Sequence, residues 1–348
     1  MAACSSDPSF ALPVAPEADA GLDDDSATAS PEGGSLAPDA GPVVPATSAV
    51  RVIVLPGTDK GIALRDAIRN AKKSVHVTMY LFTSNMYEQA IIDAKKAGRD
   101  VQVVLNGRFP DGVNSNLGQF NAFKAAGVPV VYGPPIYQFT HQKSVIIDGT
   151  EAWIMTMNMT NSSPTDNREF LVVDTDPSDV ADAEAIFQAD FKNVDVTVKG
   201  KLVVSPQQAS TPDARSRILS LINNARLTLS VEAETFSDTE VTAGLVAAKK
   251  RGLAVKVVLD GNINATPAQQ TAMAALKAAG ISVVTVTTPT IHSKTIVADG
   301  VRAYVGSQNF TTNSLLNNRE LGVIFDNAAA VKTVESTVLA DHAAGKPL

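Results

Sequence analysis

One pattern of polar residues occurs twice in this chain at a constant spacing. It begins with a histidine and a lysine two residues later, continues through an aspartate and an asparagine, and ends on an Asn-Arg-Glu triplet. The first copy occupies residues 141–169 and the second 292–320, so that 151 residues separate every matched pair of positions. Such a repeat predicts two halves of the same topology that build one site together.

The sequence around the two copies repeats as well. Residues 70–78 resemble 224–232, and residues 94–107 resemble 248–261. The duplication therefore covers nearly everything after about residue 49. We expect an N-terminal tail at 1–48, a first half at 49–198 and a second half at 199–348.

Helical patterns alternate with apolar, strand-like runs in both halves. Strands are predicted at 74–81, 101–105, 128–132, 144–147, 227–231, 254–259, 282–286 and 294–297, helices at 62–72, 86–97, 116–126, 177–191, 213–225, 239–251 and 267–279, and a crossover at 193–209. Strands separated by helices of this length predict an α/β fold, in which each half is an α/β/α sandwich around a mostly parallel sheet. The duplication predicts that a pseudo-twofold axis relates the halves.

The tail differs in composition from the rest of the chain. Residues 5–47 are rich in Ala, Pro, Asp, Ser and Gly and contain no Lys or Arg, which predicts a disordered tether. Eight of the 36 acidic residues lie there, so 29 basic residues face 28 acidic ones in the remainder. An almost neutral folded body disfavours tight nonspecific binding to DNA, which depends on many phosphate contacts.

The repeated pattern resembles the signature of the phospholipase D superfamily, H-x-K-x4-D-x6-G-S/T-x-N, which occurs twice in one chain or once in a homodimer. The second copy matches every position, and the first departs only where Met155 replaces the glycine. The resemblance implies that the two His-Lys strings face each other, with His141 as nucleophile and His292 as acid. It also implies that Glu169 and Glu320 accept the Nδ1 protons of the histidines.

The residue types suit the cleavage of a phosphodiester, which needs positive charge on the non-bridging oxygens, a nucleophile and a proton for the leaving alkoxide. Lys143 and Lys294 supply the charge, and each shares a strand face with the histidine two residues before it. Histidine titrates near pH 6.5, so its neutral and protonated forms coexist around that pH. One imidazole can therefore attack phosphorus while the other donates a proton to the leaving group, and a phosphohistidine forms. The neutral groups predicted to orient the substrate are Thr156, Asn158, Ser307 and Asn309.

Other polar and aromatic residues have structural or peripheral interpretations. Asp148 and Asp299 each precede a glycine, which predicts a hairpin turn and a structural role. The apolar loop 133–140 contains Tyr137 and Phe139, which either pack or contact a lipid or base. The four histidines and one cysteine form no ligand cluster, so neither a metal site nor a cofactor is predicted.

The single cysteine, Cys4, precedes the tail in a Met-Ala-Ala-Cys-Ser-Ser start that resembles the end of a bacterial lipoprotein signal. The charged and apolar regions of a signal peptide do not precede it. We expect a trimmed or misassigned start, a lipid tether at Cys4 and an extracytoplasmic location, as a periplasmic, outer-membrane or secreted protein. Chance similarity is the alternative.

Three functions are compatible with the sequence. The leading one is a monomeric phosphodiesterase of the phospholipase D type, which hydrolyses phospholipid head groups or transfers the phosphatidyl group to an alcohol. The alternative is a metal-independent nuclease of the same superfamily. The third is a non-catalytic module that binds phosphoanions, and Met155 is its only support in the sequence.

Overall fold

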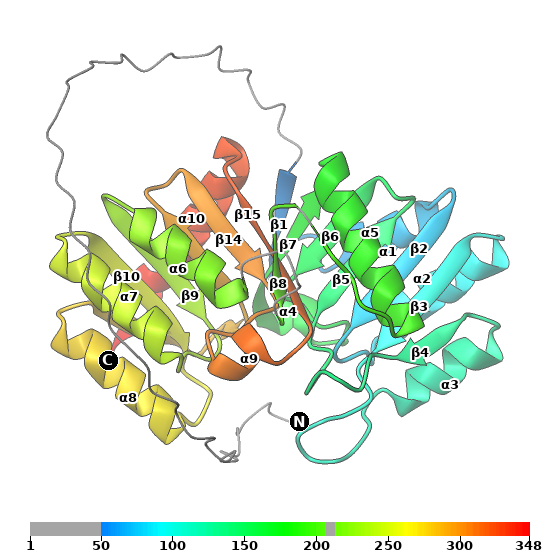
Figure 1. Ribbon diagram of the computed structural model, residues 1–348, viewed down its shortest axis with the longest axis horizontal. Helices are drawn as coiled ribbons and strands as arrows, with labels where there is room; N and C mark the ends of the chain where they lie inside the picture. The colour runs from blue at the N-terminus through cyan, green and yellow to red at the C-terminus, as the bar shows by residue number, and fades with distance from the viewer. Residues whose placement is uncertain (1–49, 199, 207–212) are drawn as a thin grey trace, which may run out of the picture.

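The computed structural model describes residues 50–198, 200–206 and 213–348, so the tail prediction and Cys4 lie outside the described residues. The first sheet contains β1 (Val50–Leu55), β2 (Ser74–Met79), β3 (Asp100–Leu105), β4 (Val130–Tyr132), β5 (Lys143–Ile147), β6 (Glu151–Met155) and β7 (Asn167–Asp174), with β12 (Thr290–Ile291) added from the second half. The second contains β8 (Leu202–Ser205), β9 (Thr228–Ala233), β10 (Ala254–Asp260), β11 (Ser282–Val286), β13 (Lys294–Ala298), β14 (Arg302–Gly306), β15 (Glu320–Phe325) and β16 (Lys346–Pro347). The orders β1-β7-β6-β5-β2-β3-β4 and β8-β15-β14-β13-β9-β10-β11 match strand for strand, which confirms the duplicated α/β fold (Figure 1).

Both sheets are mixed, which corrects the prediction of mostly parallel sheets. The strands β2, β3 and β4, and likewise β9, β10 and β11, run parallel because a helix returns the chain between them. The strands that follow each histidine motif are antiparallel to their neighbours in the same half. The predicted hairpins explain this, because Asp148 and Gly149, with φ of 57° and 66°, reverse the chain between β5 and β6.

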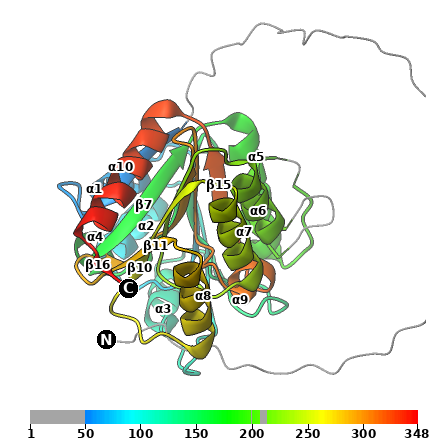
Figure 2. The same cartoon turned by 90° about the vertical axis from the view of Figure 1, so that its left-hand side faces the viewer.

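Helices cover the sheets on both faces, as Figures 1 and 2 show. The outer helices are α1 (Ile62–Asn70), α2 (Asn85–Lys96) and α3 (Leu117–Ala125) in the first half and α6 (Ala214–Asn224), α7 (Thr239–Lys250) and α8 (Pro267–Ala278) in the second. The inner faces carry α5 (Pro177–Lys192) and α10 (Ala328–Ala344), while α4 (Ser163–Asp166) and α9 (Thr312–Leu316) are short. Among the described residues, no helix has the length and apolar character needed to cross a membrane.

The inner faces of the two sheets share one hydrophobic core. It includes Phe170 and Phe187 from the first half and Val258, Leu321 and Val331 from the second, all fully buried. Separate clusters lie under the outer helices of each half. A common core of this kind holds the two halves face to face and places their histidine motifs together.

Several elements were not predicted from the sequence. The strands β1, β6, β7, β14 and β15 and the helix α10 were missed, and the predicted crossover at 193–209 contains the strand β8. Most of the missed strands follow the histidine motifs directly, where polar signature residues interrupt the apolar pattern. Several predicted helices also end one or two residues early in the structure; α1, for example, ends at Asn70 rather than at residue 72.

Candidate active site

Backbone hydrogen bonds bring each histidine motif against the triplet of the opposite half. The strand β12 pairs in parallel with the start of β7, and the N–H of His292 donates to the carbonyl of Arg168 at 3.3 Å. In the related position, the N–H of His141 donates to the carbonyl of Arg319 at 2.9 Å. The two halves are therefore interlocked at the site.

Each histidine is paired with the glutamate of the other half. The Nδ1 atom of His141 lies 2.8 Å from Oε2 of Glu320. The Nδ1 atom of His292 lies 2.8 Å from Oε1 of Glu169. Both glutamates are fully buried, and both histidines are nearly so. This exchange leaves both Nε2 atoms available for chemistry.

Thr156 and Ser307 fix these carboxylates. The hydroxyl of Thr156 donates to Oε2 of Glu169 at 2.5 Å, and Ser307 hydrogen-bonds to Glu320. The asparagine of each triplet also donates to its own glutamate, at 3.3 and 3.2 Å. Their predicted contact with the substrate stays a prediction, and both hydroxyl residues are fully buried. They orient the glutamates that hold the histidines.

Both signature lysines are fully buried and turn back toward their own histidines. The Nζ atom of Lys143 donates to the carbonyl of His141 at 2.6 Å and lies 4.9 Å from the ring centre of Tyr80. The Nζ atom of Lys294 donates to the carbonyl of His292 at 2.5 Å and forms an ion pair of 2.6 Å with Glu234. Each lysine thus places positive charge beside one histidine.

Glu234 is a site residue that the sequence analysis missed. Its Oε2 atom lies 3.6 Å from Nε2 of His292, in addition to its contact with Lys294. Residues 70–78 resemble 224–232 at an offset of 154, and two positions further that offset aligns Tyr80 with Glu234. The repeat offset therefore pointed to position 234, but because Tyr80 and Glu234 differ in residue type, comparing the two copies did not identify Glu234 as a site residue.

Burial and neighbouring charges shift the pKa values of His141, Glu320 and Glu234. Burial lowers the pKa of His141 below its usual value, and Lys143 adds to this effect while Glu320 opposes it. Burial would raise the pKa of Glu320, but His141 and Lys143 hold it below its usual range. Burial likewise acts to raise the pKa of Glu234, yet Lys294 and His292 lower it to about 2. A neutral His141 whose Nδ1 proton faces Glu320 presents the lone pair of Nε2.

Asn158 of the first half also contacts a residue of the second half. Its Nδ2 atom lies 3.5 Å from Nε2 of His292. Asn158, His292, Glu234 and Asp260 line a cavity of about 300 Å³. Asn309 occupies the matching position after β14 and is half-buried. Asn158 therefore lies in the site and faces the cavity beside His292, while the site role of Asn309 stays a prediction.

The aromatic residues of the loop 133–140 lie close to the site but are anchored. Tyr137 packs under the guanidinium of Arg319, 4.3 Å from ring centre to Cζ, and its hydroxyl accepts a hydrogen bond from the same group. Phe139 packs edge-on against Tyr80 at 6.3 Å. These contacts favour the packing interpretation over the contact with substrate that was predicted for the pair. Ile136, at the tip of the loop, is 79% exposed.

Asp148 and Asp299 combine the predicted turn with a second structural contact. The carboxylate of Asp148 accepts hydrogen bonds from the backbone N–H groups of residues 72–74, at 2.6 to 3.0 Å. Asp299 binds the N–H groups of residues 226–228 in the same way. These hydrogen bonds oppose burial and lower the pKa of both aspartates. Each aspartate fastens its hairpin to the start of the central parallel strand.

The arginines of the two triplets also bind the opposite half. Arg168 forms an ion pair with Asp341 of α10, with a nearest distance of 2.6 Å. Arg319 forms a fully buried ion pair of 2.9 Å with Asp190 of α5. The two aspartates are themselves 151 residues apart, so applying the repeat offset to acidic residues would have found them.

Met155 departs from the signature without entering the site. Its side chain is fully buried in the core under α1 and α2. In the second half, a Cβ atom on Gly306 would lie only 2.5 Å from Gln308 Oε1 and from Tyr304 Oη. The two halves therefore pack this position differently. The only support for a non-catalytic binding module is removed.

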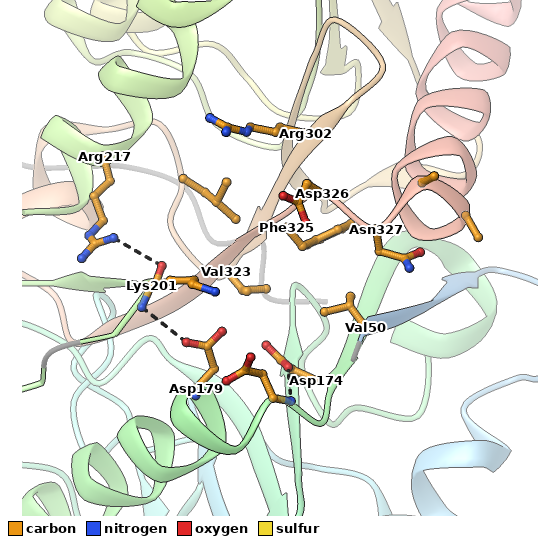
Figure 3. A pocket seen from close by; sticks show the side chains of 14 residues that line it. Val50, Asp174, Asp179, Lys201, Arg217, Arg302, Val323, Phe325, Asp326 and Asn327 are labelled. Carbon is orange, nitrogen blue, oxygen red and sulfur yellow. Dashed lines mark hydrogen bonds between the residues drawn. The ribbon is translucent and has the colours of Figure 1, made fainter. Parts of the chain in front are cut away.

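Figure 3 shows a larger cavity, of about 710 Å³, whose lining includes no histidine. Asp174, Asp179, Lys201, Arg302 and Phe325 are among its lining residues, and none of the predicted site residues lines it. Chemistry rather than cavity size therefore locates the candidate active site. Within the described ranges, no group of three or more His, Cys, Asp or Glu residues is arranged to hold a metal ion.

A family model described as a cardiolipin synthase, PLD-like domain matches residues 64–191 and 218–341, once in each half. The chain therefore belongs to the phospholipase D superfamily of phosphodiesterases and phosphatidyl transferases, and the resemblance noted in the repeated motif is confirmed. The domain bounds 49–198 and 199–348 stay predictions.

Individual relatives agree with this assignment. The probable cardiolipin synthase YwiE of Bacillus subtilis is 24% identical over 314 residues, which cover 78% of this chain and 61% of the relative. The mitochondrial cardiolipin hydrolase of Xenopus laevis is 30% identical over 140 residues, 38% of this chain and 66% of that protein. The crystal structure of phosphatidylserine synthase from Haemophilus influenzae shares the fold, with a TM-score of 0.65, 11% identity, and coverage of 85% of this chain and 87% of that one. The chain thus spans about two thirds or less of the length of the curated relatives it matches.

The prediction of an extracytoplasmic location is wrong. It rested on Cys4 and the acidic tail, whereas the relatives that match along most of this chain are bacterial cardiolipin synthases, and this similarity points against such a location.

Proposed function

We propose that this protein cleaves the phosphodiester bond of phospholipids and passes the phosphatidyl group to an alcohol or to water, through a phosphohistidine on His141. The observation that carries the proposal is the exchange of glutamates between the halves. Because Glu320 and Glu169 hold the Nδ1 atoms, both Nε2 atoms are left for proton transfer and attack in a shared site.

Two steps follow from this arrangement. In the first, Nε2 of His141 attacks phosphorus, the bond from phosphorus to the head-group oxygen breaks, and His292 gives that oxygen its Nε2 proton. In the second, the neutral His292 removes a proton from water or an alcohol, whose oxygen attacks phosphorus and breaks the P–N bond. Lys143 and Lys294 balance the charge of the non-bridging oxygens, and Asn158 and Asn309 donate hydrogen bonds to them.

Different observations support the two histidine roles and the substrate class. The lowered pKa of His141 favours the neutral form that a nucleophile needs. A carboxylate 3.6 Å from Nε2 of His292 favours a proton on that atom. The similarity to cardiolipin synthases and to a cardiolipin hydrolase favours a phospholipid over a nucleic acid.

The test compares substrates under metal-free conditions. The protein is incubated in chelator with vesicles of phosphatidylcholine and phosphatidylglycerol and, separately, with plasmid DNA. We expect release of head groups or formation of a new phospholipid, and no such product from His141→Ala or His292→Ala. Cleavage of plasmid with intact vesicles would support the nuclease instead, and restoration of a chelator-inhibited enzyme by a divalent ion would contradict the metal-independent mechanism.

A further inference from the structure

The active site is asymmetric at one pair of equivalent positions. Tyr80 directly follows β2, and Glu234 directly follows β9. The ring of Tyr80 packs against that of His141, 4.4 Å between centroids. Glu234 instead faces Nε2 of His292 at 3.6 Å and Nζ of Lys294 at 2.6 Å. An aromatic ring therefore flanks one histidine and a carboxylate flanks the other.

This difference has an electrostatic consequence. A carboxylate close to a ring nitrogen stabilises a proton on that nitrogen, whereas an aromatic ring carries no net charge. His292 is among the groups that lower the pKa of Glu234, so the carboxylate is ionised beside it. We propose that Glu234 is a positioning residue that holds the Nε2 proton of His292 until the departing alkoxide takes it, and so decides which histidine acts as acid.

The surroundings of His292 are consistent with this role. Glu169 on β7 faces its Nδ1 atom, Lys294 on β13 pairs with Glu234 at 2.6 Å, and Asn158 approaches Nε2 from the opposite half. Asp260, at the end of β10, lines the same cavity, and Glu234 contributes to raising its pKa. Among the described residues that line this cavity, Glu234 and Asp260 are the acidic groups beside His292, while Lys294, which pairs with Glu234, lies outside the lining. His141 also lowers the pKa of Glu234, after Lys294 and His292.

The inference rests on the proposed phosphodiester chemistry, and a comparison of leaving groups tests it. Glu234→Gln removes the charge and keeps the shape. On a phosphodiester with an alkyl leaving group, we expect the first-step rate to fall about 10- to 100-fold, since general acid catalysis typically contributes about 10²–10⁴-fold. On a nitrophenyl ester, which needs little protonation, the rate should stay within about threefold of wild type.

The pH profile gives a second readout that a purely structural role would not change. With the alkyl substrate, the alkaline limb of the rate should move to lower pH by about 1–2 units, because the proton is held less firmly. The matched control is Glu240→Gln, which removes a carboxylate on α7 that pairs with Arg215 at the surface. It should behave as wild type on both substrates.

Equal losses on the two substrates, or an unmoved alkaline limb, would overturn the inference. If Glu234→Gln does not fold, as judged by circular dichroism, Glu234→Asp is used because it keeps the charge but withdraws it from His292. The decrease in rate of this variant should show the same dependence on the leaving group, and wild-type rates on both substrates would contradict the inference. His141→Ala separates the two proposals, because retained turnover in that variant contradicts the phosphohistidine mechanism itself.

Discussion

At the level of single residues, one motif places two histidines in different environments. His141 lies between Tyr80 and Glu320, and burial lowers its pKa, which favours the neutral form. His292 lies between Glu169 and the additional carboxylate of Glu234. The same side chain can therefore serve as nucleophile in one half and as acid in the other, because the surrounding charges differ rather than the motif.

The lowered pKa of His141 predicts an acid limb of activity below the usual histidine range. The nucleophile must be neutral, and a lowered pKa means that it becomes protonated only at lower pH. With a nitrophenyl substrate, which makes little demand on the acid, the first-step rate should therefore remain high down to below about pH 6.5. Stopped-flow release of nitrophenolate measures it, and a half-maximal rate above that pH would contradict the assignment.

At the level of elements, the two halves solve the same packing problem in different ways. On β14, Gly306 has no room for a side chain because Tyr304, Gln308 and Gly322 enclose it. On β6, Met155 points into an apolar core instead. The signature glycine is therefore a requirement of close packing in the second half, and this requirement does not apply in the first half.

Gly306→Ala should destabilise the protein by about 1–3 kcal/mol, the usual cost of overpacking. A Cβ atom there would lie 2.7 Å from the backbone of Gly322, which cannot move as freely as a side chain. Urea denaturation measures the free energy of unfolding. Gly118→Ala is the control, because this position in α3 has open space around it and alanine favours helices, so its stability should not fall. Equal effects of the two substitutions would show that packing at Gly306 is unimportant.

At the level of the whole molecule, reciprocal pairs join the halves around the active site. Each triplet sends its glutamate to the histidine and its arginine to an aspartate of the opposite half. The backbone carbonyls of the same arginines receive the N–H groups of the histidines. Neither half holds a complete site, so catalytic geometry and association of the halves depend on the same contacts.

Arg319→Ala should therefore reduce both stability and activity. It leaves Asp190 buried without its partner, which typically costs about 3–5 kcal/mol. The double variant Arg319→Leu with Asp190→Leu should recover much of the stability, because no buried charge remains. Thermal and urea unfolding measure the difference. Arg69→Ala, which removes a half-exposed ion pair with Asp93, is the control and should change stability by less than about 1 kcal/mol. A loss in Arg319→Ala no larger than in this control would contradict the locking role.

The sequence by itself determined the duplication and the residue types of the site, whereas the predicted strand face shared by each His-Lys pair was wrong, because His141 and His292 precede β5 and β13. The duplication and the residue types are local or follow from a constant offset, so they can be read from the amino-acid sequence alone. Only the tertiary structure decided that Glu320 serves His141, and that Glu234 approaches His292, because these contacts join residues distant in the chain through pairing between the halves. The mixed sheets were also decided there, since antiparallel order arises when strands that follow a hairpin return beside their neighbours, a relation that local periodicity does not record.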